Sequence, residues 1–178
     1  FDVKVEGALS AGVNLASVTL ETIANDMANS TRTASQQLTQ VSDAGAGLVL
    51  ERIREQLGAT DVVLWNDAGV AVASAGTSLL ELSPVRPSSQ QLRSLRSGLK
   101  AMANIEGLDE VAASNTRENI DSVHVKVLAL VSNPRLELLA ERRFLQASIP
   151  LPRALVTNAL AVQDANREYQ ERALARQG

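Results

Sequence analysis

The stretch Val123-His124-Val125-Lys126-Val127-Leu128-Ala129-Leu130-Val131 decides the fold class. Valine or alanine recurs in it at every second position. Successive side chains of a strand point to opposite faces of a sheet, so a period of two predicts a strand that covers a core with one face. The chain is therefore predicted to be α+β, although helical patterns occupy both of its ends.

Four more segments are predicted to join this strand in an antiparallel sheet. Residues 143–149 are mostly apolar and end at Pro150, and residues 61–66 and 70–75 flank Asp67-Ala68-Gly69. That tripeptide has the residues of a tight turn, because glycine accepts a positive φ, and it predicts a hairpin. Residues 99–105 give the fourth segment, whose alternation is the least regular.

Long helices are predicted before and after the sheet. The first covers about residues 3–40, and its part from Val3 to Leu38 contains no proline and would form a helix of roughly 50–55 Å. A last helix is predicted over residues 153–178, with Pro152 in its first turn.

Shorter helices are predicted between these elements. One covers residues 46–57 and ends at Gly58, and another begins at the capping box Ser88-x-x-Gln91 and ends at Gly98. Residues 106–121 are polar and predict a loop with a helical turn, and residues 135–141 favour no single element.

The whole chain, residues 1–178, is thus predicted to form one domain with a PAS-like or Cache-type fold. It has a sheet region at about 60–150, with about five strands, and long N- and C-terminal helices.

Each long helix carries apolar residues at alternating spacings of three and four, which let helices pack lengthwise. In the first helix we expect this seam to mediate a parallel homodimer. The first seam comprises Leu9, Val13, Ala16, Leu20, Ile23 and Met27, and the second comprises Leu155, Ala159, Val162, Asn166, Tyr169 and Ala173. Helices that continue away from the domain at both ends of the sequence are typical of a domain that lies between two membrane spans of a longer chain. We therefore expect this sequence to be a segment of such a chain.

Composition excludes several classes of protein. A net charge of −3 argues against a nucleic-acid groove, which needs a basic stripe. The chain has no cysteine, which rules out disulfides and thiolate metal sites. Aromatic residues make up 2% of the chain, so the core is expected to be aliphatic. No signal peptide and no span of about 18 apolar residues is present.

Three stretches resemble the extracytoplasmic sensor region of NtrY-like sensor histidine kinases. They are Phe1-Asp2-Val3-Lys4-Val5-Glu6 through Leu15, Arg142-Arg143-Phe144-Leu145-Gln146 through Pro152, and Ala165-Asn166-Arg167-Glu168-Tyr169-Gln170-Glu171-Arg172. The resemblance implies a periplasmic domain of an inner-membrane receptor. It also implies a cytoplasmic kinase in the parent chain, with a response regulator as its partner.

Strand parity suggests a ligand site. If Val123, Val125 and Val127 face the long helices, then His124 and Lys126 face the other side, together with Arg142 and Gln146. Two fixed cations and an amide on one concave face would favour a small anion or a carboxylate. Trp65 could form one wall, although parity does not settle where it points. The alternative is that these polar side chains simply face water.

No cofactor, metal site or catalytic constellation is predicted. His124 is the only histidine; it lies in a strand and has no kinase phosphoacceptor context. The neighbouring carboxylates Asp109 and Glu110, and the pair Glu51 and Glu55, are interpreted as solvated surface. Asp67-Ala68-Gly69 fits a turn better than a nucleotide-binding loop.

The sequence leaves three functional interpretations open. The leading one is a sensor domain without catalysis of its own, in which a stimulus shifts the long helices against each other. The second is the ligand-binding domain of a chemoreceptor. The third is a helical adaptor whose seams dock a partner and whose sheet core is filled.

Overall fold

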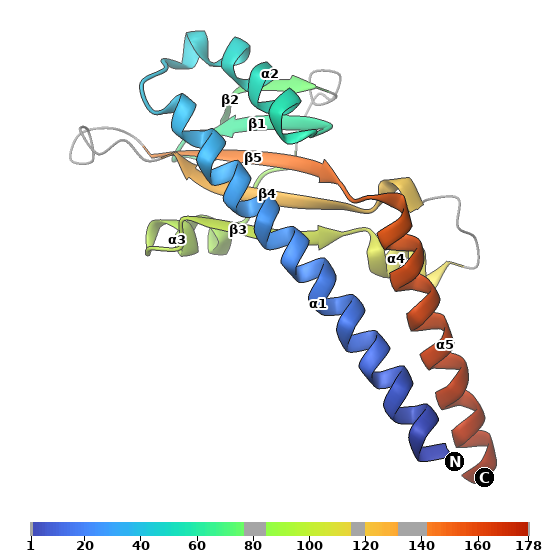
Figure 1. Ribbon diagram of the computed structural model, residues 1–178. Helices are drawn as coiled ribbons and strands as arrows, with labels where there is room; N and C mark the ends of the chain where they lie inside the picture. Colours follow the sequence, from blue (N-terminus) through green and yellow to red (C-terminus); the bar gives the residue numbers. More distant parts are fainter. Residues whose placement is uncertain (1, 77–84, 115–119, 132–141, 178) are drawn as a thin grey trace. The chain divides into compact units, whose positions relative to one another are not determined.

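The computed structural model describes residues 2–76, 85–114, 120–131 and 142–177 (Figure 1). Its centre is a five-stranded sheet in the spatial order β2-β1-β5-β4-β3. β1 pairs antiparallel with both β2 and β5, and β5 pairs antiparallel with β4. The strands are β1 (Asp61–Trp65), β2 (Ala71–Gly76), β3 (Ala101–Glu106), β4 (His124–Val131) and β5 (Arg143–Pro150). The predicted α+β, PAS-like fold is confirmed.

The helices also follow the predicted order. α1 ends earlier than expected, and a short 3-10 turn continues it. The ambiguous segment 135–141 and residues 115–119 of the predicted loop lie outside the described residues. The helical elements are α1 (Asp2–Ser35), η1 (Gln36–Leu38), η2 (Asp43–Gly45), α2 (Ala46–Leu57), α3 (Ser89–Arg96), α4 (Leu108–Ala113), η4 (Ile120–Ser122) and α5 (Arg153–Gln177).

Local signals in the sequence explain several boundaries. The Ser88 hydroxyl accepts a hydrogen bond from the Gln91 backbone, and the Gln91 side chain accepts one from the Ser88 backbone, which is the predicted capping box. Gly58 ends α2 in the left-handed conformation, with φ of 65°. In the hairpin, Gly69 has φ of 78°, and its N–H donates to the Asn66 carbonyl at 3.0 Å.

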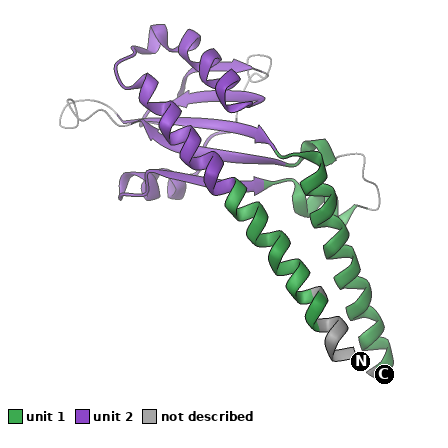
Figure 2. Ribbon diagram, in the orientation of Figure 1, with its two compact units in different colours: residues 1–23, 106–123, 151–178 green, residues 24–105, 124–150 purple. Residues whose placement is uncertain are grey.

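The chain divides into two compact units (Figure 2). Unit 1 contains residues 1–23, 106–123 and 151–178, and unit 2 contains residues 24–105 and 124–150. α1 is one continuous helix that contributes its first part to unit 1 and its last part to unit 2.

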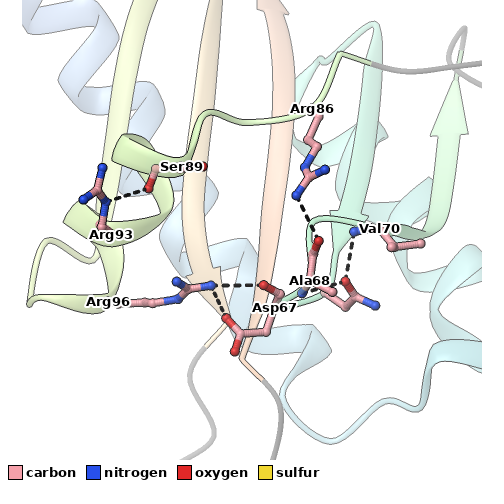
Figure 3. A network of polar contacts seen from close by, with 8 residues as sticks. Asp67, Ala68, Val70, Arg86, Ser89, Arg93 and Arg96 are labelled. Atoms are coloured by element: carbon pink, nitrogen blue, oxygen red, sulfur yellow. Dashed lines mark hydrogen bonds and ion pairs between the residues drawn. The ribbon is translucent and has the colours of Figure 1, made fainter.

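Unit 2 holds the sheet with helices on both faces. The last part of α1 lies on one face and α3 lies on the other (Figures 1 and 3). The strand residues of the α1 face are buried, and so are small residues of α1 such as Ala24, Ala28 and Thr31. Small side chains let the helix backbone approach the sheet closely. The buried strand residues of this face include Val62, Leu64, Val125, Val127, Ala129, Leu145 and Ala147.

Unit 1 contains the first part of α1 beside α5, and the two helices run antiparallel (Figure 1). They approach closely at Gly12, where an added Cβ atom would lie 3.6 Å from Cγ1 of Val162. α4 and η4 pack against the start of α5, where Val156, Ala159 and Leu160 are buried. Val162 of the seam on α5 thus faces the first part of α1 within unit 1.

Candidate functional site

The sheet face that α3 covers, called here the α3 face, carries the candidate site. Residues that pair across antiparallel strands point to the same face. Gln146 pairs with Val63 on one side and with Leu128 on the other, and Phe144 pairs with Trp65 and Leu130. The parity prediction is therefore correct: His124, Lys126 and Gln146 share a face, and this face lies opposite the last part of α1.

A buried hydrogen bond lies at the centre of the α3 face. The Trp65 indole Nε1–H donates to Oε1 of Gln146 at 2.9 Å, and the two residues are 3% and 7% exposed. Trp65 therefore points to the same face as Gln146, which the sequence had left open. Since a buried polar group without a partner costs about 1–3 kcal/mol, this bond fixes both side chains.

One half of the α3 face is apolar and covered. Leu92 and Leu95 of α3 pack with Trp65, Phe144 and other buried side chains in one cluster. Partly buried Met102 and Leu130 lie at its border. The cluster comprises Val63, Trp65, Leu92, Leu95, Leu128 and Phe144. This half is filled with side chains, so α3 is held in place by aliphatic and aromatic contacts.

The other half of the face is polar and half-exposed. Lys126 pairs with Ser148, which lies two residues from Gln146, a separation of about 7 Å along the strand. His124 pairs with Pro150 at the end of the sheet. Gln146 thus lies at the border between the apolar and the polar half. The cation nearest to it along β4 is Lys126, two residues from Leu128, which is the partner of Gln146.

The structure does not bring Arg142 to the other predicted site residues. Arg142 is exposed and lies one residue before β5 begins. It lies eight residue steps from Pro150, the partner of His124, which corresponds to about 27 Å along an extended strand. Of the five predicted residues, Trp65 and Gln146 are in direct contact and Lys126 lies nearby, whereas His124 and Arg142 lie towards opposite ends of the sheet.

Sequence reasoning missed the arginines that hold α3 and the segment before it against the β1–β2 hairpin (Figure 3). Arg96 donates to the Asp67 carbonyl at 3.0 Å and forms an ion pair with the Asp67 carboxylate. Its guanidinium lies 5.8 Å from the centre of the Phe144 ring. Arg86 donates to the Ala68 carbonyl at 3.1 Å. The signal available in the sequence is the three-residue spacing of Arg93 and Arg96 on α3. Arg93 is exposed, whereas Arg96 is half-buried beside Phe144.

Titratable groups with shifted pKa values lie outside the α3 face. The pKa of Glu51 is lowered because Arg54 donates hydrogen bonds to its carboxylate, and the pKa of Arg54 is raised by the same contact. Both residues belong to α2. Among the described residues, no group of three or more His, Asp or Glu side chains is placed to hold a metal ion.

The predicted dimer seam is partly used within the chain. Leu20 is 6% exposed, and Val13, Ala16, Ile23 and Met27 are half-buried. The side chain of Leu9 lies outside the described part. Exposed apolar residues of α1 lie instead on a neighbouring stripe, where Leu15 is 69% and Val18 is 56% exposed.

No protein-family model matches the chain, and no curated protein matches it. Among solved structures, it is similar to an extracellular ligand-binding receptor from Desulfohalobium retbaense, with a TM-score of 0.56 and 15% identity over 89% of this chain. It is also similar to the ligand-binding domain of the Campylobacter jejuni chemoreceptor Tlp3 in complex with L-norvaline, with a TM-score of 0.55 and 11% identity over 90% of this chain.

These similarities establish the fold. The match spans 28% of the first neighbour and 63% of the second, so this chain corresponds to part of each. The chain therefore has the fold of PAS-like, Cache-type sensory domains. Fold alone does not assign a function, which rests on the chemistry of the α3 face. None of the helices within the described residues is long and apolar enough to cross a bilayer.

Proposed function

We propose that this chain is the extracytoplasmic ligand-sensing domain of a membrane-bound receptor. The observation that carries the proposal is the α3 face, where Gln146 and Trp65 form a fixed polar pair beside half-exposed Lys126. The fold supports it, because both structural neighbours are described as ligand-binding proteins or domains.

The ligand class that best fits this face is a small carboxylate or another small anion. Lys126 offers a positive charge, and the Gln146 amide offers a donor, so together they offset the desolvation of an anionic group. Met102 and Leu130, the partly buried residues at the border of the cluster, supply apolar surface for the rest of the molecule. Amino acids are one suitable class, because they combine a carboxylate with a side chain of variable polarity.

A thermal-shift screen tests this proposal. The probes are acetate, succinate, phosphate, L-valine and L-norvaline, each at millimolar concentration. A probe at 100 times its Kd should stabilise the folded chain by about 2.7 kcal/mol. It should also change the emission of Trp65, which is the only tryptophan.

Matched lysine and arginine variants localise the effect. Lys126→Met should weaken the response at least tenfold, whereas Arg142→Ala should leave it intact. An equal loss in both variants would place the ligand elsewhere. No response to any probe would favour the adaptor interpretation, in which the face has no ligand.

For the parent chain we propose a two-component sensor histidine kinase, as the resemblance of the three sequence stretches implies. The alternative is a chemoreceptor, which the similarity to the Tlp3 domain favours. The full-length protein in membrane vesicles, given labelled ATP, distinguishes the two. Acid-labile phosphohistidine that passes to a response regulator supports the kinase, and its absence from an active receptor supports the chemoreceptor.

We also propose that the domain forms a weak homodimer through α1. The exposed stripe of Ala8, Ala11, Leu15 and Val18 has spacings of three, four and three. The sequence from Gly7 to Leu20 contains no charged residue, so a second copy meets no like-charge repulsion there. Leu15→Glu should lower self-association in analytical ultracentrifugation. An unchanged association constant would exclude this stripe as the dimer surface.

A further inference from the structure

Arg143, the first residue of β5, connects the sheet to the end of α1. Its Nη2 donates to the Leu38 carbonyl at 2.6 Å, and its Nη1 donates to the Val41 carbonyl at 2.9 Å. Nη1 also lies 3.2 Å from Oδ1 of Asp43. The three acceptors belong to the turn between α1 and α2, residues 36–45, called here the α1–α2 turn.

This contact is well suited to hold the α1–α2 turn in one position. The Leu38 carbonyl also accepts from the Val41 N–H at 3.1 Å, and the Arg143 guanidinium adds one donor to this carbonyl and one to the Val41 carbonyl with fixed geometry. The Arg143 side chain is 16% exposed, so water competes weakly for its donors. Leu38 is fully buried, which anchors the same turn from the apolar side.

β5 also carries the candidate ligand site. It lies between β1 and β4, and its successive side chains point to opposite faces. Phe144 and Gln146 therefore face α3, while Arg143 points to the other side and reaches the turn. Because these residues share one short backbone segment, a displacement of β5 at Gln146 also moves the guanidinium of Arg143.

We propose that Arg143 is the positioning residue that couples the occupancy of the α3 face to the end of α1. A ligand that moves Gln146 would alter the two hydrogen bonds that Arg143 makes with the α1–α2 turn. α1 is continuous from this turn into unit 1, so a change at its end is transmitted along the helix. This inference rests on the proposed function and specifies how ligand binding at the α3 face would reach α1.

Amide hydrogen exchange on the 178-residue chain tests the coupling without a ligand. Trp65→Phe removes the donor to Gln146 and so perturbs the α3 face directly. It should raise exchange in residues 36–45 at least fivefold relative to the internal reference of residues 51–57 in α2. In an Arg143→Lys background, the same change should raise it less than twofold, because lysine cannot bind two carbonyls as a fork.

Arg142→Lys is the matched control, because it alters the adjacent, exposed arginine in the same way. In that background the fivefold effect should persist. An equal response to Trp65→Phe in all backgrounds would overturn the proposal, since coupling between two sites must depend on the residue that carries it.

A second variant covers the case in which Arg143→Lys does not fold. Arg143→Gln leaves a side-chain amide that cannot reach both carbonyls as a fork. It should likewise reduce the effect of Trp65→Phe on the α1–α2 turn to less than twofold, and an undiminished effect contradicts the proposal. If no probe shifts the melting temperature but the effect of Trp65→Phe still depends on Arg143, the proposed ligand class is refuted and the role of Arg143 stands. If a probe shifts the melting temperature but the effect of Trp65→Phe does not depend on Arg143, only the role of Arg143 is refuted.

Discussion

The hydrogen bond between Trp65 and Gln146 can be measured by a double-mutant cycle. Trp65→Phe leaves Oε1 of Gln146 buried without its donor, and Gln146→Leu leaves the indole N–H buried without its acceptor. Each single change should cost about 1–3 kcal/mol for the unpaired polar group. Trp65→Phe should cost somewhat more than Gln146→Leu, because it also removes ring atoms from a packed cluster.

In the double variant neither unpaired polar group is left behind. The cost should therefore be smaller than the sum of the two single changes by about 1–2 kcal/mol. Urea unfolding followed by circular dichroism at 222 nm measures all four proteins, since it does not require the tryptophan. Gln163→Leu, an exposed change on α5, is the control partner for Trp65→Phe and should be additive with it. Additivity within about 0.5 kcal/mol for Trp65 and Gln146 themselves would show that the two side chains do not interact.

Three further predictions follow from other positions. Gly76→Ala should destabilise the chain by at least about 2 kcal/mol, because φ is 90° and a Cβ would overlap a backbone carbonyl. Gly47→Ala has open space in α2 and should stabilise the chain by about 0.5–1 kcal/mol. Urea titrations that give both variants a change in stability of the same sign would contradict this. Leu20→Glu should lower the melting temperature by more than 10 °C, whereas Leu15→Glu should change it by less than about 2 °C, since the side chains are 6% and 69% exposed. Because the pKa of Glu51 is lowered from its ordinary value of 4.5, the stability that it adds is present above pH 4.5 and is lost as the pH falls through the lowered pKa. The urea midpoints of wild type and Glu51→Gln should therefore differ at pH 7 and converge as the pH falls through the lowered pKa of Glu51.

Element types were predictable where a signal is local. The alternation of Val123, Val125 and Val127 identifies β4, and Ser88 with Gln91 identifies the start of α3, because both patterns depend on neighbours within a few residues. Parity within a strand also follows from sequence. For this reason, the prediction that Lys126 and Gln146 share a face is correct.

Distances along the sheet were not predictable. Where Arg142 lies relative to His124 depends on the register between β4 and β5, and a pattern of apolar residues does not specify which residues pair. The orientation of Trp65 was open for a related reason, because residues 62–65 are all apolar and buried and so show no alternation. The seams on α1 and α5 were recognised as packing surfaces, but helical spacing does not reveal whether the partner is the same chain or a copy.

The shared membership of α1 in both units has a consequence for its rotational phase. Inserting one residue at the boundary between Ile23 and Ala24 would turn one part of the helix by about 100° relative to the other and lengthen it by about 1.5 Å. Ala24 and Ala28 make their contacts within unit 2, and Gly12 meets Val162 within unit 1, so the helical phase between residues 12 and 24 links contacts that belong to different units. A seven-residue insertion nearly restores this phase but adds about 10 Å of helix.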